Sequence, residues 1–171
     1  MAVETQALIP LEEYLSTSYS PDREYRDGVL LERNVGDRAH ARLQTLLSAY
    51  IVSREVDWQV IVYTEMRIKI RQRWYPLPDV CVYAQPAPQE RYPERPPLLW
   101  IEILSEDDKM VDVWVKAAEL IENGVPYVWI VDPHTLKSEL WTASGAATVE
   151  DFVLRLPNTP IVIPLLDVMA K

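Results

Sequence analysis

The chain has 171 residues, 49% of them hydrophobic and 25% charged, with a formal net charge of −9 at neutral pH. This size predicts a single domain over 1–171, with a core large enough to fold unaided. The acidic balance argues against a general nucleic-acid coat protein, which binds by neutralising phosphates, but it allows an enzyme with a local basic strip.

The N-terminal segment predicts an unexported protein with a small helix and hairpin. Its first 15 residues, MAVETQALIPLEEYL, are acidic where an export signal begins with positive charge. No run anywhere in the chain approaches the roughly 20 apolar residues of a membrane span, so we expect a cytoplasmic location without membrane contact. Residues 10–18 are typical of a short helix, and residues 24–33 (EYRDGVLLER) of two strands that turn at Asp27-Gly28.

The next two segments differ in periodicity. From Arg38 to Arg54 apolar residues recur at spacings of three and four, which predicts a helix with one buried face. That face is formed by His40, Leu43, Leu46, Leu47, Tyr50 and Ile51. Residues 58–74 (WQVIVYTEMRIKIRQRW) instead alternate, which predicts one strand with a wet, basic face. This basic strip consists of Arg67, Lys69, Arg71 and Arg73.

Two apolar runs, 78–83 (PDVCVY) and 98–105 (LLWIEILS), have the length and composition of buried central strands. A loop with five prolines separates them. Cys81 is the single cysteine, so no disulfide can form within the chain and a reducing compartment is expected. We interpret Cys81 as a buried small hydrophobe.

The chain continues with a helix over 112–123, which ends at Gly124, and with an apolar strand over 127–132. A strand, a helix and a strand in this order predict a right-handed crossover between parallel strands. The whole pattern favours an α/β fold, in which helices flank a central mixed sheet and an N-terminal helix and hairpin form an extension.

The C-terminal part predicts a closing hairpin and a tail. Residues 136–142 and 150–156 are expected to pair in antiparallel fashion, and the apolar residues 160–171 to pack on the body. His134, next to Pro133, is expected in a turn. With two histidines and one cysteine, a structural zinc site is not expected.

Two acidic residues stand out because their neighbours are apolar. Asp79 begins one of the central strands, and Glu102 lies within the other, in the run LWIEIL. A buried carboxylate without a partner costs several kcal/mol, so it is usually paired, protonated or bound to a cation. An ion pair or a surface position on an edge strand is the simpler interpretation of these two residues.

Lys116 lies on the apolar face of the helix that follows Glu102. Val113, Ala117 and Leu120 share that face by the three-and-four rule, so Lys116 is expected to point at the sheet and its carboxylate. The alternatives are a lysine whose ammonium reaches out to water, or a pair with Asp112 one turn earlier.

These residues and their spacing resemble a known family. Pro78-Asp79, the run from Glu102 to Ser105, Asp112, Lys116, and the run from Gly124 to Pro133 are similar to the motifs PD, EVLSPS, Asp, Lys and GVPEYWIVDP. These motifs belong to the bacterial putative restriction endonuclease domain family of the PD-(D/E)XK nuclease superfamily. The resemblance has no gap between Glu102 and Pro133, and it covers nearly the whole chain.

The resemblance implies a restriction endonuclease-like fold and a catalytic site with a divalent metal. Asp79, Glu102 and the main-chain carbonyl of Ile103 would hold Mg²⁺ or Mn²⁺, which prefer oxygen ligands. Lys116 would orient the attacking water or offset the charge that develops on the phosphate. Leu104 stands where the superfamily signature has its lysine, and in this family that lysine appears on the following helix.

The N-terminal half adds two candidates through the same resemblance. Glu24 lies in a segment similar to the family motif YELIDGE, and would supply a third carboxylate to the site. His40 falls where the family has a histidine at the start of its first long helix, and would contact the phosphate or a metal-bound water. A charged surface run for Glu24 and a hydrogen-bonded core histidine for His40 remain equally open.

The chain departs from the family motif directly after Ser105. Glu106-Asp107-Asp108 replaces Pro-Ser-Thr, which adds negative charge beside the expected site. This acidic run is either a solvated loop or the place of a second cation. The basic strip from Arg67 to Arg73 would lead a phosphate backbone to the metal, although a solvated sheet face is the simpler interpretation.

Three functions remain. The first is a Mg²⁺-dependent endonuclease that hydrolyses phosphodiester bonds of nucleic acid, with DNA expected as the substrate in preference to RNA. The second is an inactive nuclease-like scaffold that binds nucleic acid or protein, and the third is a hydrolase of a small phosphodiester. The apolar tail and six tryptophans also offer material for a homodimer interface.

Overall fold

The computed structural model describes residues 8–34 and 36–171. The helices are α1 (Leu11–Ser16), α2 (Arg38–Val52), α3 (Glu55–Trp58), α4 (Met110–Glu122) and α5 (Leu165–Met169). The first strands are β1 (Arg23–Arg26), β2 (Val29–Glu32), β3 (Val60–Thr64), β4 (Trp74–Tyr75), β5 (Val80–Ala84) and β6 (Leu99–Ile103). The others are β7 (Tyr127–Val131), β8 (Ser138–Thr142), β9 (Gly145–Thr148), β10 (Val153–Arg155) and β11 (Val162–Pro164).

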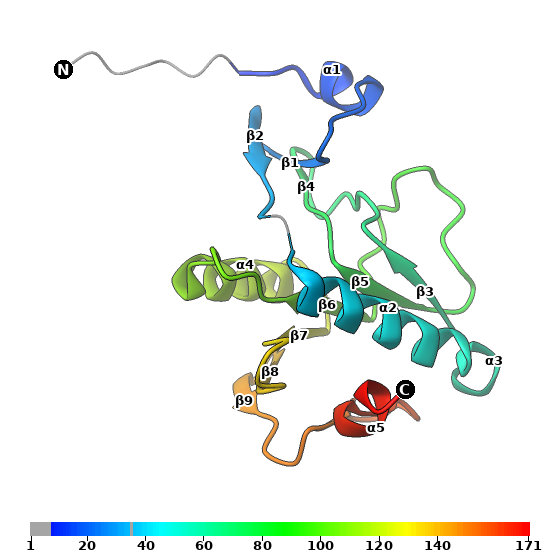
Figure 1. Ribbon diagram of the computed structural model, residues 1–171. Helices are drawn as coiled ribbons and strands as arrows, with labels where there is room; N and C mark the ends of the chain where they lie inside the picture. Colours follow the sequence, from blue (N-terminus) through cyan, green and yellow to red (C-terminus); the bar gives the residue numbers. More distant parts are fainter. Residues whose placement is uncertain (1–7, 35) are drawn as a thin grey trace.

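A six-stranded mixed sheet with the order β3-β5-β6-β7-β8-β9 forms the centre of the molecule (Figure 1). Strand β6 is parallel to β7, with α4 between them in the chain, and the other neighbouring strands are antiparallel. The expected α/β fold and the parallel pair are therefore confirmed. Strands β5, β6 and β7 are buried on both faces, which explains their continuous apolar runs.

Helices cover the two faces of this sheet and create two separate cores. On one face, α2 and α5 bury leucine and valine side chains against Val80, Ile101 and Trp129. On the other, α4 packs with Ala117 and Leu120 against Trp100 and neighbouring side chains. Cys81 is fully buried in this second core, as its apolar surroundings predicted.

The N-terminal extension forms a smaller sheet with the order β2-β1-β4. Its hairpin turns at Asp27 and Gly28, which have φ angles of 51° and 97°, the left-handed geometry that favours an Asp-Gly turn. Helix α1 packs on this sheet through a cluster of Tyr14, Tyr25 and Tyr75. The predicted helix and hairpin are both present, and they lie at one side of the central sheet (Figure 1).

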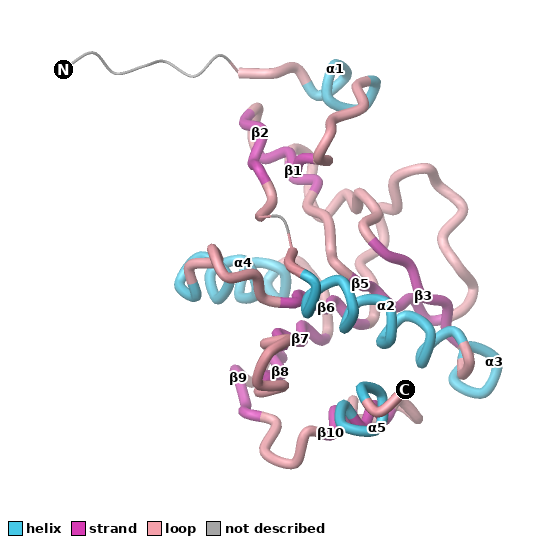
Figure 2. The backbone as a smooth tube through the Cα atoms, in the orientation of Figure 1, coloured by secondary structure: helices cyan, strands magenta, loops and turns pink. Residues whose placement is uncertain are grey.

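The single strand predicted over 58–74 is wrong. Residues 55–58 form α3, β3 ends at Thr64, and residues 65–73 run as loop before the short strand β4 (Figure 2). Glu65 has a φ angle of 49°, a left-handed conformation that ends the extended backbone. The basic side chains therefore alternate along a loop and do not form one face of a strand.

The predicted pairing of the C-terminal segments is also wrong. Strand β8 pairs with β9, which directly follows it, and β10 pairs with β11 in a separate two-stranded sheet. Strand β9 consists of small, exposed residues without an apolar pattern, so alternation could not reveal it. The tail packs on the body as expected, because Leu165 and Val168 of α5 are buried against α2. No helix within the described residues is long and apolar enough to cross a membrane.

Candidate active site

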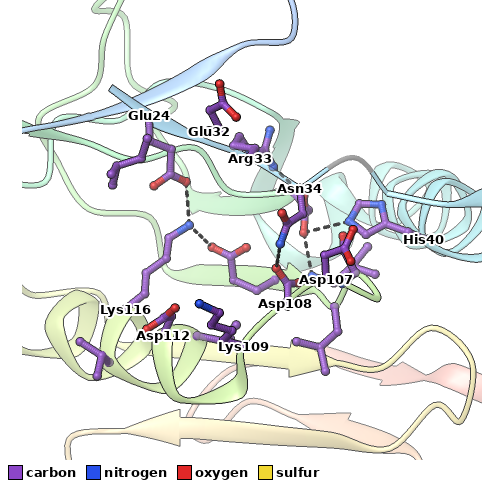
Figure 3. Close-up of a pocket in the computed structure, with 18 of the residues that line it drawn as sticks. Glu24, Glu32, Arg33, Asn34, His40, Asp107, Asp108, Lys109, Asp112 and Lys116 are labelled. Atoms are coloured by element: carbon purple, nitrogen blue, oxygen red, sulfur yellow. Dashed lines mark hydrogen bonds and ion pairs between the residues drawn. The ribbon is translucent and has the colours of Figure 1, made fainter. Parts of the chain in front are cut away.

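A cleft of about 540 Å³ opens between the N-terminal hairpin and one end of the central sheet. Its walls come from β1 and β2, the first turn of α2, the end of β6 and the N-terminal part of α4 (Figure 3). The five residues predicted to be catalytic all line it: Glu24, His40, Asp79, Glu102 and Lys116. These residues come from distant parts of the chain, and the fold brings them together.

Asp79 is almost completely buried and both of its carboxylate oxygens are bound. Oδ1 lies 2.7 Å from Nη2 of Arg33. Oδ2 accepts a hydrogen bond of 2.7 Å from the Ile103 N–H and lies 3.3 Å from Nε2 of His40. Burial by itself would raise the pKa of Asp79, but the contacts with His40, Arg33 and Ile103 outweigh it and lower the pKa.

Glu102 lies beside Asp79 at the end of the neighbouring strand. Strands β5 and β6 pair Val80 with Ile101, so one further step of this antiparallel register sets Asp79 opposite Glu102. Glu102 shares the α4 face of the sheet with Trp100, whose indole N–H donates to its Oε1 over 2.7 Å. The two apolar strands thus bring two carboxylates to one end of the sheet.

Lys116 points at the sheet, as the phase of its helix predicted. Its Nζ lies 2.6 Å from Oε1 of Glu102 and 2.7 Å from Oε1 of Glu24, as Figure 3 shows for Glu24. Burial opposes the charged ammonium, but these two carboxylates outweigh it and raise the pKa of Lys116. Lys116 therefore pairs with Glu102 and Glu24, and not with Asp112.

The pKa of Glu102 is also raised, first by burial and then by Asp79 and Glu24, although Lys116 works against this shift. A raised pKa on both partners of one ion pair looks contradictory at first. Both shifts arise because one ammonium serves two carboxylates, the buried Glu24 and the partly buried Glu102. We conclude that Lys116 is charged and that the acidic cluster is short of positive charge.

Glu24 and His40 are both buried at the wall of the cleft. Glu24 is 7% exposed and accepts from the Leu77 N–H as well as from Lys116, so it does not belong to a charged surface run. His40 is hydrogen-bonded to Asp79 at the wall of the cleft, and this contact raises its pKa despite burial, which would lower it. Ile103 lines the same cleft, where its N–H binds Asp79.

Sequence reasoning missed Arg33 as a residue of this site. It follows β2 directly, and its charged end reaches Asp79, a residue 46 positions further along the chain. In the sequence Arg33 ends the predicted hairpin segment EYRDGVLLER and resembles a surface residue. Gln44 was missed as well, and its side-chain amide donates to the Asp79 carbonyl over 2.9 Å. A single sequence carries no signal for either contact.

The acidic run after Ser105 lies partly in the cleft. Asp108 accepts hydrogen bonds of 2.7 Å from the Ser105 N–H and from the Asn34 amide, so it shapes the loop and connects it to the hairpin side. Glu106 lies at the surface, where its carboxylate, Asp37 and His134 have ligand atoms within 4.8 Å of one another. Asp37 already caps α2 and pairs with His134 in this exposed group.

The basic strip does not form one open surface. Arg67 pairs with Asp22, Lys69 with Glu94, and Arg71 with Asp27. Arg73 forms no ion pair within residues 8–34 and 36–171, and its guanidinium lies 3.5 Å from the Tyr25 hydroxyl. A role of the four side chains in nucleic-acid binding stays a prediction.

The carboxylates of the cleft are ligands of the kind that Mg²⁺ or Mn²⁺ prefers, although among the described residues the group of three whose ligand atoms lie within 4.8 Å of one another is Asp37, Glu106 and His134. Asp79, Glu102 and Glu24 offer only oxygen atoms and lie beside open space, as hard cations with several water ligands require. The cleft is also strongly acidic, because seven carboxylates oppose four lysines and arginines along its walls. The acids are Glu24, Glu32, Asp79, Glu102, Asp107, Asp108 and Asp112, and the bases are Arg26, Arg33, Lys109 and Lys116.

Comparison with known proteins identifies a family and a related fold. The family model Uma2, described as a putative restriction endonuclease, matches residues 11–168. A crystal structure of a putative nuclease belonging to DUF820 from Anabaena variabilis ATCC 29413 superposes with a TM-score of 0.81. It is 19% identical, and the match covers 95% of this chain and 98% of that one. No curated protein matches the sequence.

Proposed function

Because the chain belongs to the Uma2 family of putative restriction endonucleases, we propose that it is a metal-dependent nuclease that hydrolyses phosphodiester bonds of DNA. One observation carries the proposal: Lys116 binds Glu102 over 2.6 Å in the cleft that Asp79 also lines. The buried Asp79, the partly buried Glu102 and a charged lysine at one end of a sheet supply both a cation site and a cation for the substrate.

In this proposal Asp79, Glu102 and the Ile103 carbonyl hold Mg²⁺ or Mn²⁺, and Glu24 adds a third carboxylate. The metal would polarise the phosphate and lower the pKa of an attacking water. Without a cation the acidic walls repel the phosphate backbone, which supports a dependence on divalent metal.

The protein side chains act on the substrate and on its water. Lys116 stays charged against its two carboxylates, and its ammonium stabilises the negative charge that develops on the phosphate oxygens. His40 lies at the wall of the cleft within reach of Asp79 and orients a water or contacts the phosphate. The basic residues Arg67, Lys69, Arg71 and Arg73 remain candidates for contacts with the DNA backbone beyond the cleft.

Metal binding and cleavage test the proposal together. Purified protein should bind Mn²⁺ in calorimetry and nick supercoiled plasmid with Mg²⁺ or Mn²⁺. Asp79→Asn and Glu102→Gln should each lose both properties, since each removes one negative charge from the donor set. His134→Ala is the matched control, because it changes the exposed group with Asp37 and Glu106 and leaves the cleft intact. Cleavage that survives both carboxylate variants would refute the assignment.

A non-catalytic scaffold is the second candidate. The specific observation in its favour is that Arg33, His40 and Ile103 already bind both oxygens of Asp79. A protein that keeps these contacts permanently would bind no Mn²⁺ at Asp79, and plasmid would stay intact at any metal concentration. The same calorimetric titration of wild type and Asp79→Asn therefore separates the two functions.

A homodimer is part of the proposal, and two surfaces of the chain offer exposed apolar side chains for its interface. The tail exposes Val162 and Leu166, although other side chains of the tail are buried within the chain itself. Helix α4 exposes Val111, Trp114 and Val115 on one side. Sedimentation of wild type and Val111→Glu tests this surface, because a dimer that uses it should dissociate in the variant.

A further inference from the structure

Arg33 is a buried cation for which the proposed function provides no role. Its side chain is 19% exposed, lines the cleft and ends 2.7 Å from Oδ1 of Asp79. Removing a guanidinium from water costs free energy. Asp79 already has contacts with Ile103 and His40, which are sufficient to hold its carboxylate in place. The position of Arg33 therefore calls for a second explanation.

The charges around the cluster suggest one. Glu24, Asp79 and Glu102 carry three negative charges when ionised, and Arg33 and Lys116 bring two positive charges into direct contact with them. A divalent cation among these carboxylates would change the local sum from −1 to +1. Arg33 is the group that such a cation would displace, because its guanidinium binds Oδ1 of Asp79, an oxygen that the cation needs as a ligand.

We propose that Arg33 is a substrate-binding residue that holds Asp79 in the metal-free protein and turns to the scissile phosphate once a divalent cation takes its place. The inference rests on the proposed function and adds a residue to it. Arg33 would thus keep the acidic cluster folded and, after the exchange, supply positive charge to the DNA backbone.

The chemistry of arginine suits both tasks. Its planar guanidinium presents five N–H donors in a fork that matches a carboxylate and a phosphate equally well, and it stays charged at any relevant pH. Arg33 also enters the cleft from the hairpin wall, opposite Lys116 of α4 (Figure 3). A phosphate between these walls would meet one cation from each.

The first test is the affinity for Mn²⁺ in the absence of DNA. Arg33→Ala should bind Mn²⁺ about tenfold more tightly than wild type, since a neighbouring cation shifts the proton affinity of a carboxylate by at least about a factor of ten. Arg23→Ala is the matched control, because it removes the same charge from the same hairpin at an exposed pair with Glu32. It should leave the affinity for Mn²⁺ unchanged.

The second test is binding of a short fluorescent DNA duplex in Ca²⁺, a larger cation that also takes oxygen ligands. Arg33→Ala should bind the duplex about tenfold more weakly, while Arg23→Ala should not. Arg33→Lys keeps the charge without the fork, so it should bind Mn²⁺ like wild type and the duplex more weakly. This variant also remains informative if Arg33→Ala does not fold.

Opposite changes in the two affinities are the expected signature. Equal or weaker Mn²⁺ binding by Arg33→Ala, with wild-type binding intact, would overturn the proposal and make Arg33 a structural clamp of Asp79. Unchanged duplex binding by both variants would overturn it as well. If wild type itself binds no Mn²⁺, the proposed function fails, and that result differs from any failure of Arg33 alone.

Discussion

The molecule holds two groups of basic side chains that look alike in the sequence and differ in the structure. Arg67, Lys69 and Arg71 lie on a loop and pair with carboxylates at the surface. Arg33 and Lys116 instead pair with the buried carboxylates of the cleft. An ion pair with a buried partner costs far more to break than an exposed one, so burial of the acid decides what each cation contributes.

Removal of the Lys116 ammonium should have the largest effect. Lys116→Ala leaves the buried Glu24 and the partly buried Glu102 without their shared cation, which should lower the free energy of unfolding by about 3 kcal/mol, the lower end of the cost of breaking a buried pair. Urea denaturation measures this change. Lys109→Ala, a lysine at the mouth of the same cleft, is the control and should unfold like wild type. A loss below about 1 kcal/mol for Lys116→Ala would show that water reaches the two carboxylates.

Arg67 should behave as an intermediate case. Its guanidinium pairs with Asp22, whose side chain is 36% exposed, and it also lies over the Tyr14 ring, 4.5 Å from the centroid. Arg67→Ala should therefore lower the free energy of unfolding by about 1–2 kcal/mol, mainly through lost packing of the N-terminal extension. Urea denaturation again gives the value. Arg67→Lys keeps the charge, so a loss of equal size would assign the effect to the ring contact.

The pair of His40 and Asp79 makes the comparison dependent on pH. Asp79 raises the pKa of His40 above its ordinary value of 6.5 despite burial. The stability that protonated His40 contributes is therefore fully present below pH 6.5 and is lost as the pH rises through the pKa of His40 in the folded state. The free energy of unfolding of wild type, measured across this window, should fall relative to that of His40→Gln. A constant difference between the two proteins would mean that folding does not shift the pKa of His40.

At low pH the contact between Asp79 and His40 gives the opposite pH dependence of stability, because there the carboxylate titrates. His40 and Arg33 lower the pKa of Asp79 below its ordinary value of 3.8. The stability that Asp79 contributes is present above pH 3.8 and is lost as the pH falls through the folded pKa. Asp79→Asn should be less sensitive to acid than wild type in the same denaturation series.

The sequence predicted the centre of the site better than its surroundings. Asp79 and Glu102 stand out among apolar neighbours, and the phase of α4 turns Lys116 toward them, so local patterns already indicated these three residues. Arg33 reaches a partner 46 positions away, and no local pattern encodes that contact. The resemblance to a family added Glu24 and His40, which no periodicity in this chain would have selected.

The two errors in the fold have a common physical origin. Alternation over 58–74 predicted one strand where the chain turns after Thr64, and the apolar content of 150–156 predicted a strand paired with 136–142, whereas the strand there, β10, pairs with β11. Glu65 takes a left-handed conformation that ends β3, and β8 finds its partner in β9, four residues without a hydrophobic pattern. A strand is defined by its hydrogen-bonded neighbour, and side-chain alternation indicates a strand only where one of its faces is buried.

Lys69 should show the smallest effect on stability. It pairs with Glu94, whose side chain is 67% exposed, and water screens both charges. Lys69→Ala should therefore unfold at the same urea concentration as wild type.

The affinity of Lys69→Ala for DNA is the sharper measurement, because a phosphate competes with Glu94 for the ammonium. Glu94→Gln, which frees Lys69, should strengthen duplex binding at low salt if this loop meets the backbone. Identical binding by wild type and both variants would exclude Lys69 from the cations that contact DNA, and burial of the acid would remain as the difference between this ion pair and those of the cleft.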